Sequence, residues 1–426
     1  MTADFLTLPD APRLTLANLT VPACLIGAQG SVAPLSLTLE GGKIVTGDDP
    51  GAIVDMKRAM VFPAFLDMHT HLDKGHIWPR SPNPDGSFRG AIEAVGADSR
   101  ARWTAKDVRA RMEFSLRAAY AHGTRAIRTH LDSAPPQDDI SWGVFREVRS
   151  DWAGRIDLQA ACLVSIENVS RAGDFRHTAD LVAASGGVLG TVTYPTADLH
   201  HQIDDFFALA RDRGLPVDFH VDETLDPTVN TLKVLAQKVL DLHFDAKVVV
   251  GHLCSLSTMS EAEALSTLDL VAKAGLHVVS LPMCNLYLQD RHARRTPRNR
   301  GITLVHEMKG RGIPVSFASD NTRDPFYAYG DMDMLEVMRE ATRIGHLDHS
   351  DPDWTHAFLT NPAKACGFPS PSLAPGAPAD LVITRARTWA ELFSRPQSDR
   401  IVLRNGRAID RTLPDYAELD PLMEDA

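Results

Sequence analysis

The chain has 426 residues, more than the roughly 250–300 at which a single hydrophobic core stops growing, so we expect a large domain and a smaller one. It carries 44 Lys and Arg against 55 Asp and Glu, a formal net charge of −11. This acidic balance argues against nucleic acid as a partner, because sequence-independent binding needs a basic surface. Hydrophobic residues make up 44% of the chain, which is enough for a sizeable core and argues against disorder.

The cysteines and the N-terminus bear on the cellular compartment. The five cysteines are scattered and form no CxxC pair, which indicates reduced thiols and a cytoplasmic protein. Met1–Pro12 lacks the basic start and apolar stretch of a secretory signal. No run approaches the ~18 apolar residues of a membrane span, so we expect no membrane partner.

Both ends of the chain are rich in short predicted strands. These are Arg13–Val21, Leu35–Leu39, Lys43–Val45, Asp380–Ile383 and Ile401–Leu403, and Asn405-Gly406 is a hairpin signal. The part of the chain between them has a different pattern. We therefore expect residues 1–60 and 370–426 to meet in one small β-sandwich domain.

The middle of the chain, residues 61–369, alternates predicted strands and helices. Eight apolar strands are expected at Val61–His71, Thr124–His130, Ile156–Val164, Val188–Tyr194, Pro216–Val221, Lys247–Leu253, Leu276–Leu281 and Pro314–Ala318. The clearest helical periods lie at Ala105–Ala121, Asp204–Arg213, Thr228–Leu242 and Ser260–Ala274. A glycine precedes several strands, at Gly123, Gly214, Gly275 and Gly312, as expected where a helix ends. The repeat predicts an α/β fold, a (β/α)8 TIM barrel, with a doubly wound sheet as the alternative.

Histidine and aspartate recur where the predicted strands end. His69 and His71 lie two residues apart on the first strand and therefore point to the same side. His220, His252 and Asp320 end the fifth, sixth and eighth strands. Catalytic groups of a barrel lie at these carboxyl ends. Three imidazoles and a carboxylate suit a divalent first-row metal with a position open for water.

Each of these residues also has an ordinary explanation. A single HxH is common, His220 alone could be a hydrogen-bonded core residue, and Asp320 could cap a helix. Their coincidence at four strand ends favours the metal site. His130 is treated as an ordinary core residue that could line the pocket. The basic loop Arg291–Arg300 is interpreted either as a solvated loop or as a lid or clamp for an acidic substrate.

These motifs resemble the amidohydrolase superfamily over nearly the whole chain, and most closely its cytosine deaminase branch. The matching segments are Phe62-Pro63-Ala64-Phe65-Leu66-Asp67 before His69-Thr70-His71-Leu72-Asp73, Arg128-Thr129-His130-Leu131-Asp132, His220-Val221-Asp222-Glu223, Gly251-His252-Leu253, and Ser319-Asp320-Asn321-Thr322-Arg323-Asp324-Pro325-Phe326.

The resemblance implies one divalent metal ion, Zn²⁺ or Fe²⁺, held by His69, His71, His220 and Asp320. Binuclear members bridge two metals with a carboxylated lysine, usually at the end of the fourth strand. Here that strand ends in Thr193-Tyr194-Pro195-Thr196, and no lysine occurs between Lys106 and Lys233. We therefore expect a mononuclear site.

The resemblance also assigns roles for the deamination of an amino-substituted N-heterocycle. The metal would lower the pKa of bound water from ~15.7 towards ~7, so that hydroxide attacks the ring. Asp320 would take the proton of the water, and His252 would orient the hydroxide and stabilise developing charge. Glu223 would protonate a ring nitrogen and then the leaving ammonia.

Four residues are expected at the substrate, and three of them depart from the cytosine deaminase pattern. Thr196 stands where a glutamine is usual, Asn321 replaces a second aspartate, and Phe326 replaces a tryptophan. A hydroxyl cannot offer the paired donor and acceptor of an amide. Lys74 adds a cation that either contacts the substrate or pairs with a nearby carboxylate. Cytosine or a related pyrimidine-like ring is the first expectation for the substrate.

Two alternatives remain. One is a hydrolase of the same fold acting on an N-alkylamino-triazine or a cyclic amide. The other is a non-catalytic barrel that only binds, which the complete set of ligands and Glu223 argue against. The expected partner is a small heterocyclic molecule, and the sequence leaves a homo-oligomer open.

Overall fold

The structure is a computed structural model that describes residue 5, residues 7–170 and residues 173–424. It has a mixed α/β fold and divides into two compact units. The first contains the chain up to Leu66 together with Arg117–Ala126 and Asp333–Leu413. The second contains Asp67–Leu116, Ile127–Met332 and the chain from Pro414 onward.

Strands from both chain ends form one sheet in the first unit. Its order is β16-β15-β14-β5-β1-β2-β3, and β4 also pairs with β1. The strands are β1 (Arg13–Pro22), β2 (Val32–Glu40), β3 (Lys43–Val45), β4 (Ala52–Asp55), β5 (Met60–Pro63), β14 (Leu381–Thr384), β15 (Ile401–Arg404) and β16 (Arg407–Ala408). The two ends join where β5 runs antiparallel to β14. All these strands lie in a single continuous sheet. A sandwich consists of two sheets packed face to face, so the expected β-sandwich stays a prediction.

The strand expected at Val61–His71 is two strands. β5 ends at Pro63 and β6 (Phe65–Thr70) begins two residues later. Ala64 donates its N–H to the carbonyl of Asp380, and Phe65 donates to the carbonyl of Gly123. The chain therefore changes sheets at Ala64, and an unbroken apolar sequence could not reveal this change.

Eight strands follow one another around a closed ring. One sheet has the order β6-β7-β8 and another the order β13-β12-β11-β10-β9. The strands after β6 are β7 (Thr124–Asp132), β8 (Asp157–Leu163), β9 (Leu189–Thr193), β10 (Val217–Val221), β11 (Val248–His252), β12 (His277–Ser280) and β13 (Val315–Phe317). Parallel bridges Ser165↔Val192 and Thr70↔Asp320 connect the two sheets at both seams. This closure is consistent with the expected barrel and argues against an open doubly wound sheet.

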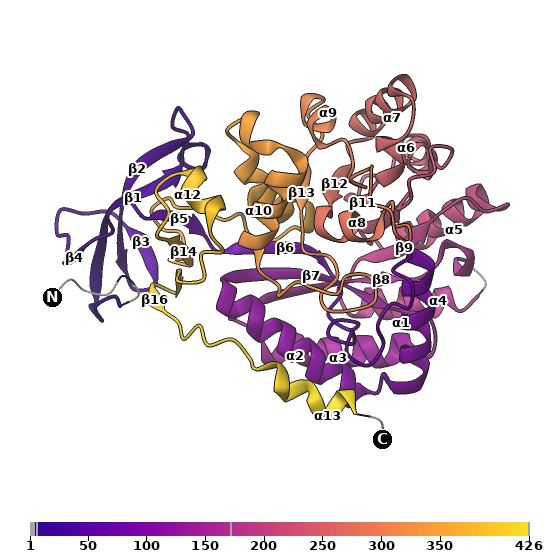
Figure 1. Ribbon diagram of the computed structural model, residues 1–426, viewed down its shortest axis with the longest axis horizontal. Coiled ribbons are helices and arrows are strands. Elements are labelled where there is room, and N and C mark those ends of the chain that lie inside the picture. Colours follow the sequence, from indigo (N-terminus) through magenta and orange to yellow (C-terminus); the bar gives the residue numbers. More distant parts are fainter. Residues whose placement is uncertain (1–4, 6, 171–172, 425–426) are drawn as a thin grey trace. The chain divides into compact units, whose positions relative to one another are not determined.

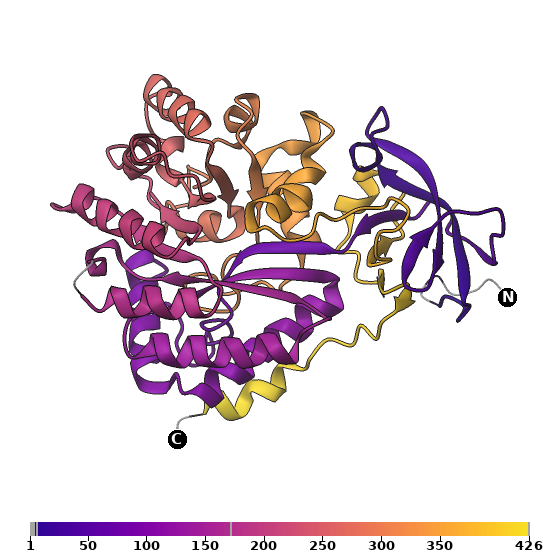
Figure 2. The same cartoon turned by 180° about the vertical axis from the view of Figure 1, so that it is seen from behind.

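Helices connect successive strands of the ring (Figure 1). They are α1 (Phe88–Arg102), α2 (Ala105–His122), α3 (Gln137–Asp151), α4 (Phe175–Ala184), α5 (Leu199–Asp212), α6 (Thr231–Asp241), α7 (Glu261–Ala274), α8 (Pro282–Leu288) and α9 (Val305–Gly310). Further helices are α10 (Met334–Gly345), α11 (Thr360–Cys366), α12 (Trp389–Ser394) and α13 (Asp420–Met423). Seen from behind, the helices that follow β7 and β8 cover the outer side of these strands (Figure 2).

The four expected helices are present, and their capping residues explain where they begin and end. α6 begins at Thr231 rather than Thr228, because the Asn230 side chain accepts the N–H of Lys233 as an N-cap. Gly275, which follows α7, has φ +67°, the left-handed conformation expected at a helix end. Among the described residues, no helix has the length and apolar character needed to cross a membrane.

Candidate functional site

The predicted metal ligands converge at the carboxyl ends of the ring strands. The Nε2 atoms of His69 and His220 are 3.1 Å apart, and those of His71 and His220 are 3.5 Å apart. Oδ1 of Asp320 lies 3.1 Å from Nε2 of His71 and 3.5 Å from Nε2 of His69. All four residues are buried. The ends of two strands, β6 and β10, and the segment after β13 thus present four donor atoms to one point.

The spacing and the protonation state of this cluster fit a divalent metal. Metal–ligand bonds of about 2.0–2.1 Å in a tetrahedron place neighbouring donor atoms about 3.3–3.4 Å apart, which matches the observed distances. Burial, reinforced by neighbouring imidazoles or cations, lowers the pKa of His69, His71 and His220 well below the ordinary histidine value. The rings are therefore neutral and have lone pairs available for a cation. Oδ2 of Asp320 is buried and has no hydrogen-bond partner among the described residues.

Backbone and hydroxyl contacts fix the position of Asp320. Its N–H donates to the carbonyl of His69 over 2.9 Å, and its own carbonyl accepts the Thr70 hydroxyl over 2.8 Å. The preceding Ser319 donates its hydroxyl to Asp67 over 2.5 Å. Asp320 itself has φ +63°, a conformation that non-glycine residues rarely adopt. This conformation is maintained by the bridge between β6 and the end of β13.

His130 belongs to the same cluster of imidazoles. Its ring centroid lies 4.0 Å from that of His69 and 4.7 Å from that of His220. The ring is fully buried, and neither of its nitrogens has a hydrogen-bond partner among the described residues. His130 therefore lies in the core, packed against the predicted ligands.

Glu223 and His252 are joined by an amide that the sequence analysis did not select. Nδ2 of Asn285 in α8 lies 3.1 Å from Oε1 of Glu223 and 3.0 Å from Nδ1 of His252. Because an amide nitrogen only donates, Nδ1 of His252 accepts, and its proton is on Nε2. Burial lowers the pKa of His252 to about 3, and burial and the Asp320 carboxylate raise the pKa of Glu223 well above its usual value. Glu223 can thus carry a proton at neutral pH.

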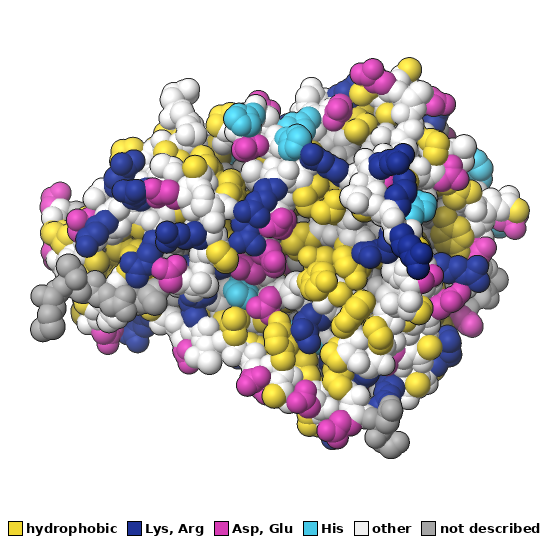
Figure 3. Space-filling model, viewed as in Figure 1, with side chains coloured by type: hydrophobic (Ala, Val, Ile, Leu, Met, Phe, Trp, Pro, Cys, Tyr) yellow, Lys and Arg dark blue, Asp and Glu magenta, His cyan; other side chains and the backbone are white. Residues whose placement is uncertain are grey.

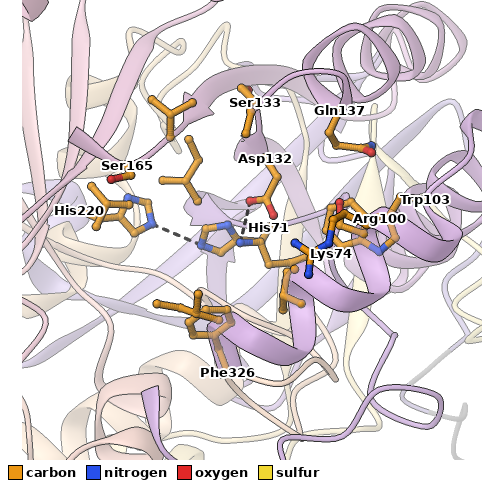
Figure 4. Close-up of a pocket in the computed structure, with 18 of the residues that line it drawn as sticks. His71, Lys74, Arg100, Trp103, Asp132, Ser133, Gln137, Ser165, His220 and Phe326 are labelled. Carbon is orange, nitrogen blue, oxygen red and sulfur yellow. Dashed lines mark hydrogen bonds and ion pairs between the residues drawn. The ribbon is translucent and has the colours of Figure 1, made fainter. Parts of the chain in front are cut away.

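A cavity of about 780 Å³ opens from the cluster. His71, His220, Glu223, Lys74 and Phe326 are among its lining residues, and Figure 4 shows Phe326 close to the rings of His71 and His220. Nζ of Lys74 is 2.8 Å from Oδ1 of Asp132 and 5.3 Å from the centre of the Phe326 ring. The cavity therefore offers both a cation and an apolar face next to the predicted reacting groups.

The predicted substrate residues differ in where they lie. Lys74, Asn321 and Phe326 line the cavity. The Asn321 amide donates to Asp324 over 2.7 Å. Thr196 is outside the lining and donates its hydroxyl to Gln202 over 2.6 Å. Tyr194 lines the cavity instead, because β9 ends at Thr193 and the chain then turns away.

The basic loop Arg291–Arg300 does not line this cavity. Asp290 organises the loop by accepting the side chain of Arg295 and, over 2.8 Å, the N–H of Asn299. Basic side chains gather on the face shown in Figure 3 near α8. These contacts favour a solvated loop over a clamp on a substrate in the cavity.

Asn285, Asp132 and helix α1 are functional candidates that sequence reasoning did not identify. Asn285 had a usable signal, because it follows the predicted seventh strand by a few residues, as the other site residues follow theirs. Asp132 lies two residues after His130 on β7, and the sequence analysis includes it in a motif without assigning it a role. The sequence of α1 gave no such signal, because no local residue pattern shows that one face of this helix lines a cavity.

Known proteins resemble this chain in sequence and in fold. A family model described as "Amidohydrolase family" matches residues 163–409. A protein named pterin deaminase, from Rhizobium rhizogenes, is 51% identical over 99% of this chain and 100% of its own length. The crystal structure of 5-methylcytosine deaminase from Klebsiella pneumoniae with 5-fluorocytosine has a TM-score of 0.78 at 24% identity, covering 95% of this chain and 98% of that one. N-isopropylammelide isopropylaminohydrolase from Burkholderia multivorans has a TM-score of 0.72 at 26% identity, covering 93% and 97%.

Proposed function

Since the chain belongs to the amidohydrolase family and is a hydrolytic deaminase that acts on carbon–nitrogen bonds, we propose that it deaminates a pterin-type ring, a 2-amino-4-oxopteridine. The observation that carries this proposal is the 51% identity to a pterin deaminase over 99% of the chain. The cavity of about 780 Å³ also suits a bicyclic ring.

This substrate replaces cytosine as the first expectation. The 5-methylcytosine deaminase shares the architecture at 24% identity, which supports the fold and not the substrate. Thr196, where a pyrimidine deaminase has an amide, lies outside the cavity lining. A bicyclic ring needs different contacts, and Lys74 and Phe326 are available for them.

His69, His71, His220 and Asp320 are proposed to hold one divalent ion, with zinc and iron as candidates. When bound, this ion would act as a Lewis acid and lower the pKa of water. Oδ2 of Asp320, which has no hydrogen-bond partner among the described residues, accepts the proton of the attacking water.

The remaining roles follow from the Asn285 contacts. Nε2–H of His252 is buried, has no partner within the described residues and orients the water oxygen. The protonated Glu223 donates to the ring nitrogen beside the reacting carbon. The new C–O bond forms, and Asp320 passes the proton taken from water to the amino group. The C–N bond then breaks to release ammonia, while the hydroxyl proton of the adduct moves to Glu223 and restores its protonated form. The product carries a carbonyl where the amino group was.

Substrate comparison tests the proposal. The purified enzyme, loaded with zinc or iron, is assayed for ammonia from pterin, cytosine and 5-methylcytosine, and for isopropylamine from N-isopropylammelide. We expect pterin to have the highest kcat/KM. No ammonia from pterin with metal-loaded enzyme, or faster turnover of another compound, would overturn the proposal.

Two variants test the roles in the same assay. Glu223→Gln should lower kcat on pterin by about 10²–10⁴-fold and keep its metal, because Glu223 is not a ligand. Asp320→Ala should lose both activity and metal. Near-normal turnover by Glu223→Gln would contradict the proton-transfer role.

We also propose a domain organisation and a cellular compartment for the protein. Within the predicted bounds 61–369, the ring strands β6 to β13 form a (β/α)8 barrel, and residues 1–60 and 370–426, together with the rest of β5, form a β-sandwich domain. Cysteines 24, 162, 254, 284 and 366 are all free thiols, which supports the cytoplasm as the compartment.

A further inference from the structure

One face of helix α1 lines the cavity. Phe88, Ile92, Val95 and Ser99, spaced by three and four residues, are all part of the lining. An apolar stripe with this spacing normally packs into a core. Ile92 nevertheless remains 51% exposed. Apolar surface exposed inside a cavity is typical of a ligand site.

The chain after β7 also lines the cavity. Pro135, Pro136 and Ile140, from the segment between β7 and α3 and from α3 itself, line it. We call the part of the cavity between these residues and the α1 face the outer compartment. In Figure 4, Gln137 and Arg100 lie on the side of Lys74 away from His220, and the reacting carbon of a substrate would lie near His71 and His220. A ring held there would therefore extend any substituent towards the outer compartment.

Arg100 supplies a positive charge at the outer compartment. Of the three arginines of α1, Arg89 pairs with Glu93 over 2.8 Å, and Arg102 donates to the carbonyl of Glu424 over 2.9 Å. Arg100 lines the cavity, is exposed and has no ion pair or hydrogen bond within the described part of the chain. In Figure 4 it lies beyond Lys74, on the side away from His220.

Gly96, one turn before Arg100 in α1, leaves space for the Arg100 guanidinium. A Cβ built on Gly96 would lie 3.2 Å from Nη1 of Arg100, closer than most such contacts. Glycine inside a helix costs roughly 1 kcal/mol relative to alanine, so its presence calls for a local reason. The close approach of Arg100 over Gly96 is such a reason.

Lys74 cannot serve the same purpose. It is buried, and its ammonium lies 2.8 Å from the Asp132 carboxylate. Of the lining cations Lys74, Arg100 and Arg102, Arg100 is therefore the one with neither an ion pair nor a hydrogen bond among the described residues. A guanidinium binds a carboxylate through two parallel hydrogen bonds, a pairing that a neutral ester cannot reproduce.

We propose that Arg100 is a specificity-determining residue that selects substrates whose ring carries an apolar substituent ending in a carboxylate. The apolar part of the substituent packs against Ile92 and Pro135, and the carboxylate pairs with Arg100. This inference rests on the proposed function for the ring, and it adds the class of substituent.

The test compares an acid with its ester. Two substrates are prepared: a 2-amino-4-oxopteridine with a benzoyl-type substituent ending in a carboxylate, and the methyl ester of that compound. For the wild type we expect kcat/KM to be about tenfold higher for the acid, mainly through a lower KM. In Arg100→Gln the ratio of acid to ester should fall to about one. Arg89→Gln, which removes an arginine of α1 outside the cavity, should keep the wild-type ratio.

A wild type without preference for the acid, or an Arg100→Gln enzyme that retains it, would overturn the proposal. The failure of the proposed function is seen separately, as no ammonia from any pteridine. In that case calorimetry with the carboxylate-bearing substituent alone, as benzoate with an apolar extension, decides the role of Arg100. A Kd about tenfold higher in Arg100→Gln supports the role, and an equal or undetectable affinity in both proteins overturns it.

Discussion

Asn285 is the residue on which the geometry of the proposed proton transfer depends. Its side-chain nitrogen contacts both Glu223, at 3.1 Å, and His252, at 3.0 Å. This single donor orients the proposed acid and determines which imidazole nitrogen carries a proton. Asn285 touches neither the predicted metal nor the reacting atoms, so we describe it as a positioning residue.

Asn285→Leu should lower kcat by about 10–100-fold and leave the metal content unchanged, because both contacted groups lose their orientation. The pH dependence of kcat should also shift, since Glu223 loses a hydrogen bond to its carboxylate. Gln289→Leu is the matched control: Gln289 donates over 3.1 Å to the backbone carbonyl of Glu223 and not to its side chain. A loss as large in Gln289→Leu as in Asn285→Leu would contradict the assignment.

Backbone strain at the strand ends could not be predicted from residue identity. Asp222, His252 and Asp320 all have positive φ, at 49°, 73° and 63°. These residues follow or end strands of the ring, and each is held by its surroundings. Asp222, for example, accepts the N–H groups of Thr231 and Leu232 over 3.0 Å. Such strain is typical of functional sites.

At the scale of single elements, the carboxylate of Asp333 at the start of helix α10 makes several contacts at once. Asp333 is the N-cap of α10 and accepts the N–H of Leu335 over 2.9 Å. The same carboxylate pairs with both ends of the Arg400 guanidinium, at 2.7 and 2.6 Å. Burial opposes ionisation, but Arg400 and His122 outweigh it and hold the pKa of Asp333 far below its ordinary value.

This shift predicts a pH-dependent loss of stability. Because the folded pKa is depressed, the stabilisation is fully present above the unfolded pKa of about 4 and is lost as the pH falls below it. Asp333→Asn should lower the free energy of unfolding at pH 7 by about 3–5 kcal/mol, since Arg400 stays buried without its partner. The difference from wild type in urea unfolding should shrink below about pH 4.

Asp399→Asn is the control for this measurement. Its pair with Arg385 is roughly half exposed, with side-chain exposures of 47% and 48%. Exposed ion pairs contribute little, so the change at pH 7 should stay below about 1 kcal/mol. An Asp333→Asn effect that is equally small, or that does not depend on pH, would contradict the assignment.

For the whole molecule, the buried imidazole cluster predicts that metal binding stabilises the fold. Four buried donor groups face one another at 3.1–3.5 Å, a spacing that suits a bound cation. A metal at about 1,000 times its Kd stabilises the folded state by about 4 kcal/mol. Chelation should therefore lower Tm by roughly five degrees, and added zinc or iron should restore it.

Differential scanning calorimetry with and without a chelator measures this shift. His220→Ala, which removes one predicted ligand, should unfold at nearly the same temperature under both conditions. If the wild type loses its metal and Tm does not change, the cluster does not couple metal binding to folding.

Much of this molecule follows from local patterns in its sequence. Apolar runs and helical periods predicted the order of the strands and helices, because period and composition are local properties. The types and positions of His69, His71, His220, Asp320 and Glu223 indicated the chemistry, because parallel strands bring their carboxyl ends together. The family resemblance that these residues carry agrees with the comparisons.

Other features were decided only by the tertiary structure. The change of sheet at Ala64, the placement of Thr196 outside the cavity and the contacts of Asn285 depend on loop paths and on closure of the ring. The exposed guanidinium of Arg100 depends on which face of α1 meets the cavity. A side chain's neighbours across a ring of strands come from distant parts of the chain. The sequence therefore determined which groups are present, and the packing decided which of them meet.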